Sequence, residues 1–252
     1  MKTILITQAR MGSTRLPGKV LKVVNEQTLL EIHLNRLRQC KNVNEIIVAT
    51  TLADADEKIE KLAQSLNFEV YRGSENDVLD RYYNAVLPYQ AEWVVRVTSD
   101  CPLLDSALVD DVIKIAIEKN VDYCSNTIDP HFPDGQDVEV FKFSALEKAW
   151  KEASAASERE HVTPYIWKNC DVKGGSLFSG FSYVIPQNYG HLRMTVDELN
   201  DFKVVEQLIQ KLGNNKTWLD YTQAIINGEL STLNNQHSRN EGYQKSINKD
   251  GK

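Results

Sequence analysis

The stretch ILITQARMGSTRLPGKV, residues 4–20, decides the fold and directs the search for a site. Its short apolar run ends abruptly, and a polar loop follows with two glycines, a proline and three cations, Arg10, Arg15 and Lys19. A buried strand that carries a cationic loop, rich in backbone N–H groups, at its carboxyl end is the arrangement with which α/β proteins hold phosphate groups. The stretch therefore predicts a strand followed by a polyphosphate-binding loop.

Spacing excludes the two most common phosphate-binding motifs. Five residues separate Gly12 from Gly18, where the Walker A pattern needs four, and Val20 stands where that pattern needs a magnesium-binding hydroxyl. Pro17 would also remove a backbone donor from the cradle. A dinucleotide-binding GxGxxG pattern is absent. The alternative is a charged surface loop, which three cations and a fixed proline at a strand end disfavour.

The first half of the chain alternates strand-like and helix-like patterns. Strands are predicted at 3–7, 45–50, 69–71 and 93–98, with helices after each of them, at 28–37, 56–66, 77–87 and 106–119. This order predicts an α/β fold with a mainly parallel sheet and helices on both faces. Ligands of such sheets bind at the carboxyl ends of the strands, where three polar clusters lie, at 9–19, 72–81 and 99–105.

The second half is less regular. Segments 137–143 and 173–184 resemble antiparallel strands, 193–196 a further strand, and 145–152, 158–167 and 201–212 helices. We therefore expect a small antiparallel β extension. From residue 229 the chain is polar and lacks a periodic apolar pattern, which predicts one domain over 1–228 and a disordered tail over 229–252.

Composition narrows the class of protein. The 252 residues carry a net charge of −6, which disfavours a nucleic-acid surface. The four cysteines are scattered without a CxxC pair, so we expect free thiols in a reducing cytoplasm and no zinc site. The first apolar stretch is too short for a signal peptide or a membrane span. These features predict a cytoplasmic protein.

Two aspartates are candidate ligands for magnesium, which proteins bind through one or two carboxylates together with substrate phosphates. Asp100 follows a hydrophobic strand in RVTSDCPLLD, and Asp197 follows a β-rich run in RMTVDELND. Asp100 could instead cap a loop. Asp54 and Asp56 form a DxD pattern, but their position at a helix start favours a capping role.

The motifs together resemble the sugar-activating cytidylyltransferases, whose first loop reads roughly A-R-x-x-S-[TK]-R-L-P-x-K. The resemblance spans residues 1–210 and is greatest to the group of the spore coat polysaccharide protein SpsF, which is related to CMP-Kdo and CMP-sialate synthetases. It implies a Rossmann-like nucleotide-diphospho-sugar transferase fold and a homodimer. It also implies Mg²⁺-dependent transfer of CMP from CTP to a sugar acid, sugar phosphate or similar acceptor, for surface polysaccharide biosynthesis, with no nucleic-acid or membrane partner.

The resemblance also implies roles for individual residues. Arg10, Lys19 and Asp100 would be catalytic, and Asp100 and Asp197 would hold the metal. Nucleotide-binding roles fall on Ala9, Met11, Gly12, Ser13, Arg15, Arg72, Ser74 and Arg96. Acceptor-binding roles fall on Asp137, Glu139, Arg159, His161 and Arg193. Arg15 could instead pair with a carboxylate, and His161 could accept a proton or be structural. A phosphate or carboxylate on the acceptor would account for Arg159 and Arg193.

Two other functions stay open on the sequence alone. A glycosyltransferase of the same fold would need a DxD at the end of the fourth strand, and no aspartate stands two residues before Asp100. A non-catalytic nucleotide-binding protein would be indicated by loss of Lys19 or Asp100, and both are present.

Overall fold

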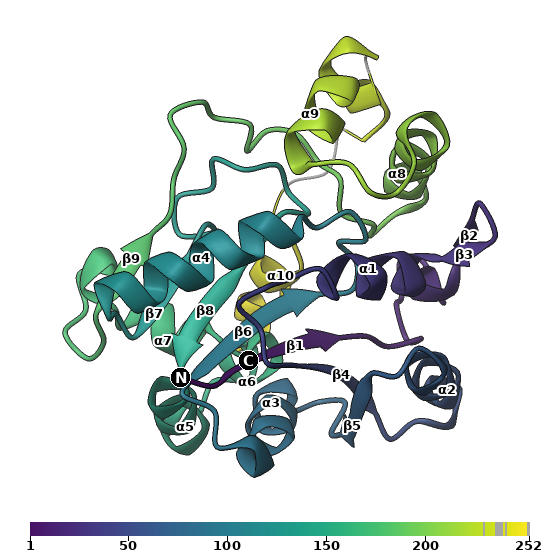
Figure 1. The fold of residues 1–252 in the computed structure, drawn as a ribbon. Coiled ribbons are helices and arrows are strands. Elements are labelled where there is room, and N and C mark those ends of the chain that lie inside the picture. The colour runs from purple at the N-terminus through teal and green to yellow at the C-terminus, as the bar shows by residue number, and fades with distance from the viewer. Residues whose placement is uncertain (229, 235–238, 240, 251–252) are drawn as a thin grey trace.

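The computed structural model describes residues 1–228, 230–234, 239 and 241–250, and its centre is a seven-stranded sheet (Figure 1). The strand order is β5-β4-β1-β6-β8-β7-β9. The strands are β1 (Thr3–Gln8), β4 (Glu45–Thr51), β5 (Glu69–Gly73), β6 (Trp93–Thr98), β7 (Tyr123–Ser125), β8 (Glu139–Lys142) and β9 (Gly180–Ser182). β8 runs antiparallel to both of its neighbours, and the other pairings are parallel. A separate hairpin joins β2 (Val23–Val24) to β3 (Gln27–Thr28). The predicted α/β fold is confirmed.

Helices cover both faces of the sheet because its strands are apolar on both sides. Ile4 and Ile6 of β1 pack in the same cluster as α3 and α5, whereas Leu5 packs toward α4 on the opposite face. Figure 1 shows α4 and α1 above the sheet and α3 and α5 below it. The helices are α1 (Leu29–Leu37), α2 (Glu57–Ser65), α3 (Val78–Val86), α4 (Ser106–Lys119), α5 (Phe143–Glu152), α6 (Ala156–His161), α7 (Pro164–Lys168), α8 (Leu199–Leu212), α9 (Trp218–Asn227) and α10 (Glu241–Asp250).

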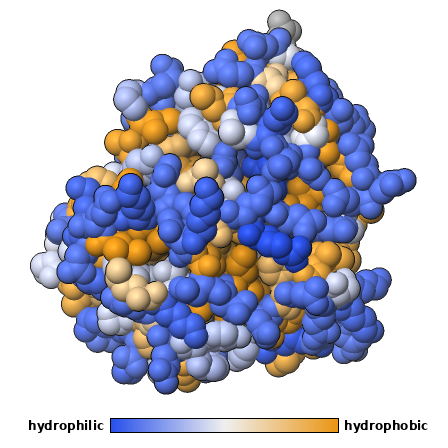
Figure 2. All heavy atoms as spheres, in the orientation of Figure 1, coloured by the Kyte–Doolittle hydropathy of each residue, from blue (hydrophilic) through white to orange (hydrophobic). Residues whose placement is uncertain are grey.

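Short 3₁₀ turns connect several of these elements. They are η1 (Lys19–Leu21), η2 (Asp54–Asp56), η3 (Leu87–Tyr89), η4 (Asp171–Lys173) and η5 (Leu230–Leu233). On the face drawn in Figure 2, hydrophilic side chains predominate and apolar ones form separate patches. No helix within the described part of the chain is long and apolar enough to cross a membrane.

Register brings the functional loops together. Gln8, the last residue of β1, lies opposite Thr98, the last residue of β6. The Ser99 hydroxyl then donates to the Gln8 carbonyl oxygen at 2.7 Å. The loops that follow these two strands therefore start side by side at one edge of the sheet, as the parallel arrangement predicts.

The C-terminal region differs from the prediction. In residues 229–252, expected to be disordered, the structure places η5 and the helix α10, so the prediction is wrong for residues 230–234 and 241–250. For 229, 235–238, 240 and 251–252 it lies outside the described residues. Two strand predictions also differ. Residues 193–196 form only a bridge between Arg193 and Asp134, and β9, the paired part of 173–184, runs parallel to β7.

Candidate active site

The loop after β1 is folded around Met11. The Met11 carbonyl oxygen accepts hydrogen bonds from the N–H groups of Ser13 at 2.9 Å and Gly18 at 3.1 Å. The Met11 N–H donates to a carboxylate oxygen of buried Asp56 at 2.7 Å. Gly18 has a φ of 66°, a conformation that favours glycine. Asp56 therefore anchors this loop, and its carboxylate does not cap α2.

Lys19, on η1 at the end of the loop, lies between two carboxylates. Its Nζ is 3.0 Å from Asp100 Oδ2 and 2.8 Å from Asp197 Oδ1. Burial opposes the charged forms of Lys19 and Asp100, but the attraction between the two charges outweighs it. The pKa of Lys19 is therefore raised and the pKa of Asp100 is lowered. Thr98 also donates a hydrogen bond to Asp100. The three residues, predicted separately from sequence, thus converge on one point.

Arg193 orients Asp197. Its guanidinium Nη2 donates to Asp197 Oδ2 at 2.8 Å, Nη1 to Asp134 Oδ2 at 2.5 Å and Nε to Asp201 Oδ1 at 2.9 Å. The side chain is 7% exposed. Arg193 lines the cleft, as the prediction of an acceptor contact requires, but its donors are directed to protein carboxylates. Arg193 therefore holds Asp197, a candidate metal ligand, in a fixed orientation.

The carboxylates fit a divalent cation that is bound together with phosphate. No group of three or more histidine, cysteine, aspartate or glutamate side chains able to hold a metal occurs among the described residues. Asp100 and Asp197 nevertheless point oxygens at the same position, which the Lys19 ammonium takes here. Two carboxylates plus phosphate oxygens are the donor set that Mg²⁺ prefers in nucleotide complexes.

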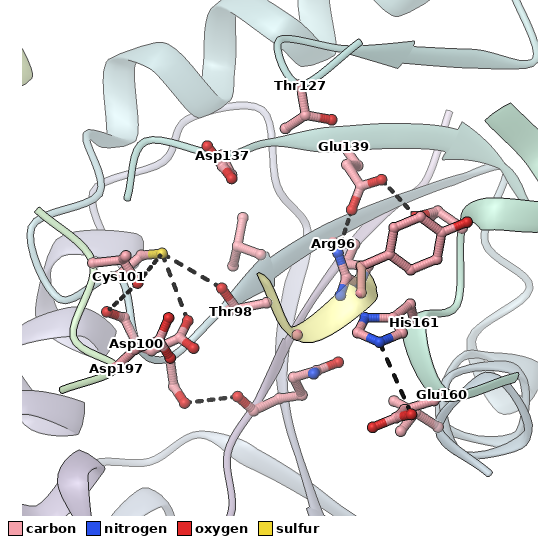
Figure 3. A pocket seen from close by; sticks show the side chains of 18 of the residues that line it. Arg96, Thr98, Asp100, Cys101, Thr127, Asp137, Glu139, Glu160, His161 and Asp197 are labelled. Carbon is pink, nitrogen blue, oxygen red and sulfur yellow. Dashed lines mark hydrogen bonds and ion pairs between the residues drawn. The ribbon is translucent and has the colours of Figure 1, made fainter. Parts of the chain in front are cut away.

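A cleft of about 660 Å³ extends from this point along the edge of the sheet (Figure 3). Four predicted nucleotide-binding residues line it, namely Ala9, Ser13, Arg15 and Arg96, and so does Arg10, which was predicted to be catalytic. Arg15 pairs with Asp197 at 2.9 Å and with Glu198 at 3.8 Å, the carboxylate alternative considered above. Arg10 is 47% exposed and pairs with Glu75 at 3.3 Å.

Four predicted nucleotide-binding residues, Met11, Gly12, Arg72 and Ser74, do not line the cleft. Arg72 points away from it, because its guanidinium bonds the carbonyl oxygens of Thr51 and Ala53 and pairs with Glu60 at 3.0 Å. The Ser74 hydroxyl accepts the N–H of Asp77. Local backbone and side-chain partners therefore account for Arg72 and Ser74.

The half of the cleft predicted to hold the acceptor lies beside β8. Asp137, Glu139 and His161 line the cleft, and Figure 3 shows Glu139 and His161 at the end opposite Asp100 and Asp197, with Asp137 on the same side as Asp100. Glu139 forms an ion pair with Arg96 and accepts hydrogen bonds from the hydroxyls of Tyr123 and Thr163. Burial and, to a smaller extent, the charge of Arg96 lower the pKa of His161 to about 4, so the ring is neutral at pH 7.

Arg159 lies outside this half of the cleft. Its Nε donates to Asp77 Oδ2 at 2.7 Å, and Nη1 bonds the carbonyl oxygens of Trp150 and Ala153. The structure therefore does not bring Arg159 to the predicted acceptor position. These contacts connect α6 to α3 and α5.

Sequence patterns did not indicate the contribution of the C-terminal segment, where α10 lines part of the cleft and Arg239 contacts a cleft residue. Arg239 pairs with Asp137 and donates to the Phe132 carbonyl oxygen at 3.0 Å. The Tyr243 ring lies edge-on to His161, 5.1 Å between centroids, and the Ser246 hydroxyl is 3.1 Å from His161 Nε2. A polar helix with few apolar residues is difficult to recognise from periodicity, although its single tyrosine is among the residues that line the cleft.

This α/β fold, with a cationic loop after β1 and two carboxylates converging on it, indicates the nucleotidyltransferase class. The chain belongs to the cytidylyltransferase family, whose model matches residues 4–219. It is thus an enzyme of the nucleotidyltransferase class.

Individual relatives agree with this family. The chain is 44% identical over 211 residues to an uncharacterized protein of Methanocaldococcus jannaschii, covering 82% of this chain and 83% of the relative. It is 29% identical over 226 residues to the spore coat polysaccharide biosynthesis protein SpsF of Bacillus subtilis, covering 83% and 87%. The solved structure of a cytidylyltransferase from Leptospira borgpetersenii superposes with a TM-score of 0.86 at 32% identity, covering 94% of this chain and 98% of that one.

Proposed function

We propose that this protein transfers CMP from CTP to a small acceptor in a magnesium-dependent reaction that releases pyrophosphate. The observation that carries the proposal is the Lys19 ammonium held between Asp100 and Asp197 at the end of the loop after β1. A cation flanked by two carboxylates, beside a loop rich in N–H groups, suits a metal-bound triphosphate. Family membership supports CTP as the nucleotide.

Each part of the loop has a role under this proposal. Arg10 and Lys19 neutralise the β- and γ-phosphates, which leave as pyrophosphate. Asp100 and Asp197 would hold the magnesium ion. When bound, that ion would offset the negative charge that develops on the α-phosphate oxygens. Arg193 keeps Asp197 oriented throughout.

The acceptor occupies the half of the cleft beside β8. Its oxygen attacks the α-phosphorus in line, an oxygen–phosphorus bond forms, and the bond from the α-phosphorus to the bridging oxygen of pyrophosphate breaks. A phosphate acceptor loses no proton in this step, whereas a hydroxyl acceptor gives its proton to a base. His161 is neutral and lines this half, so it could take that proton.

The proposed acceptor is a sugar acid, a sugar phosphate or a similar compound, used in surface polysaccharide biosynthesis. The similarity to the Bacillus subtilis spore coat protein supports this class of pathway. A homodimer, implied by the family resemblance, completes the proposal, and light scattering of the purified protein would measure it directly.

The direct test measures pyrophosphate release from CTP and Mg²⁺ with a panel of sugar acids, sugar phosphates and phosphorylated alcohols. We expect release with at least one acceptor and its loss in Asp100→Asn. Asp54→Asn is the matched control, because Asp54 lies on η2 and does not line the cleft. Equal activity of Asp100→Asn and the parent protein would contradict the metal assignment. Transfer from a nucleotide-sugar donor without pyrophosphate release would favour a glycosyltransferase.

A further inference from the structure

One buried arginine of the cleft forms no ion pair with the described residues. Arg81, on α3, lines the cleft and is 3% exposed. Its Nη1 donates to the Ser74 carbonyl oxygen at 2.7 Å, while its buried Nε–H has no hydrogen-bond partner. Within the described part of the chain, no aspartate or glutamate forms an ion pair with it.

Other arginines of the cleft differ from Arg81 in this respect. Arg15 pairs with Asp197, Arg96 pairs with Glu139, and Arg193 pairs with three aspartates. Arg10, which pairs with Glu75, is half exposed to solvent. Arg81 is therefore a desolvated guanidinium that no described carboxylate contacts in an ion pair. The more distant carboxylates of Asp56 and Glu75 favour its charged form, and a bound anion in direct contact would stabilise it further.

A second cation lies close to Arg81. Burial lowers the pKa of the Arg81 guanidinium and the positive charge of Arg10 lowers it further, whereas Tyr82, Asp56 and Glu75 act in the opposite direction. Glu75, which pairs with Arg10, offsets part of the repulsion between the two arginines, and a bound anion would offset more of it. The arrangement thus favours a negatively charged ligand group near both side chains.

The stem of Arg81 is held in place by the end of β5. A Cβ atom on Gly73 would lie 3.0 Å from Arg81 Cγ, so the glycine lets the strand backbone pack directly against the arginine stem. Its Nη1 is fixed by the Ser74 carbonyl group. A guanidinium positioned in advance loses little conformational freedom when it binds an anion.

We propose that Arg81 binds a phosphate group of the nucleotide, together with Arg10. This inference rests on the proposed function, since it assumes that CTP occupies the cleft. Sequence patterns do not distinguish Arg81 from a solvent-exposed charge on a helix. Under this inference, Arg81 takes the nucleotide-binding role that was expected of Arg72. A planar guanidinium that lines the cleft without a carboxylate partner suits charge-assisted hydrogen bonds to phosphate oxygens.

The test uses the full chain with Arg81→Gln, Arg81→Lys and the control Arg72→Gln. Arg72 precedes Arg81 by nine positions on the β5–α3 segment, but its partners lie outside the cleft. Calorimetry would give the dissociation constant for CTP in the presence of Mg²⁺. Cytidine, which carries the base and ribose without phosphate, would be measured by competition. Thermal unfolding without nucleotide would report on folding.

We expect Arg81→Gln to weaken CTP binding roughly ten- to hundredfold and to leave cytidine binding unchanged. Arg81→Lys should recover part of the loss. The melting temperature without nucleotide should stay equal or rise, because a buried charge without an ion-pair partner has been removed. Arg72→Gln should lower the melting temperature, since Arg72 pairs with Glu60, and keep the affinity for CTP.

Three results would overturn the inference. Unchanged CTP affinity in Arg81→Gln would do so, as would a lower melting temperature with normal affinity, which a structural role predicts. An equal loss for cytidine and CTP would show that Arg81 contacts the base or ribose. If the parent protein itself does not bind CTP with Mg²⁺, the proposed function fails together with this inference.

Discussion

At the scale of single residues, Lys19 keeps the metal-ligand candidates Asp100 and Asp197 compatible with each other. Both carboxylates approach its Nζ to within 3.0 Å, so without this ammonium they would repel each other at short range. Its positive charge lies between the two carboxylates that would hold the proposed magnesium ion, and the same charge is suited to a departing pyrophosphate. Lys19 thus neutralises the two carboxylates when no nucleotide is bound, and in the proposed reaction it would neutralise the leaving pyrophosphate.

Replacing Lys19 tests this double role. Lys19→Met should abolish pyrophosphate release and lower the melting temperature without metal. Mg²⁺ alone should then stabilise the variant more than it stabilises the parent protein, because two uncompensated carboxylates attract a cation more strongly. Differential scanning fluorimetry with and without Mg²⁺ measures the effect. Lys61→Met, which removes an exposed lysine on α2, is the control. Identical Mg²⁺ shifts in the two variants would contradict the prediction.

His33 links the loops at the strand ends through buried hydrogen bonds. Its Nε2 is 2.9 Å from the Thr7 hydroxyl and its Nδ1 is 3.0 Å from the Cys101 carbonyl oxygen. Burial lowers its pKa from 6.5 to about 4. Between these values the unfolded chain binds a proton that the folded protein does not, so stability is lost as the pH falls from about 6.5 to 4.

The contribution of His33 can be measured by substitution. We expect the free energy of unfolding to fall by about 1–3 kcal/mol over this pH range because of this residue. His33→Gln should flatten that part of the profile, measured by urea unfolding between pH 7 and 4.5. His191→Gln, which replaces an exposed histidine, is the control. A parallel profile for His33→Gln and the parent protein would refute the prediction.

Sequence patterns identified Lys19, Asp100 and Asp197 because each follows a strand or loop with a distinct local pattern. They misplaced Arg72 and Arg159, whose long side chains are held by nearby carbonyl groups and carboxylates. They did not single out Arg81. An arginine near the start of a helix has the same sequence pattern whether its side chain faces solvent or a cleft. Which of the two it faces depends on how segments distant in sequence pack around the helix.

At the scale of elements, α10 forms part of the proposed acceptor site. It packs against α6, and Asp250 and Ser246 bond Ser157, Glu160 and His161 of that helix. Tyr243 alone brings a large ring toward the cleft from this helix. In the other half of the cleft, the carboxylates of Asp100 and Asp197 pair with Lys19, and no residue of α10 takes part in these ion pairs.

A substitution in α10 should therefore separate the two substrates. Tyr243→Ala is expected to raise the KM for the acceptor several-fold, because the ring packs on His161 and Trp167, and to leave the KM for CTP unchanged. Ile247→Ala is the control on the same helix, where Ile247 is an exposed side chain. Initial rates of pyrophosphate release give both constants. A higher KM for CTP alone would contradict this division of the cleft.

The elements of the first half could be predicted because each strand is a continuous apolar run within a regular alternation. β7 could not, since a strand of three residues depends on pairing partners far away in sequence. β9 lies within the expected strand at 173–184, but its parallel pairing with β7 was not predicted. The expected strand at 193–196 instead supplies Arg193 to an aspartate network. Its backbone pairs only through one bridge with Asp134.

At the scale of the whole molecule, nucleotide binding should stabilise the fold. The cleft is lined by residues of several strands and helices, so a bound ligand connects segments that are distant in sequence. A ligand at about 100 times its dissociation constant adds about 2.7 kcal/mol to stability. We expect CTP with Mg²⁺ to raise the melting temperature more than UTP, ATP or GTP does. Equal shifts with all four nucleotides would disprove a preference for CTP.

The antiparallel strand β8 divides the sheet between two runs of chain. Strands β1, β4, β5 and β6 come from residues 3–98, and β7, β8 and β9 come from residues 123–182. A protein engineer could therefore exchange the second run, together with α10, between relatives and keep the first intact. In such hybrids the leaving-group chemistry would be inherited from one parent and the choice of acceptor from the other, so acceptor range could diversify without rebuilding the triphosphate site.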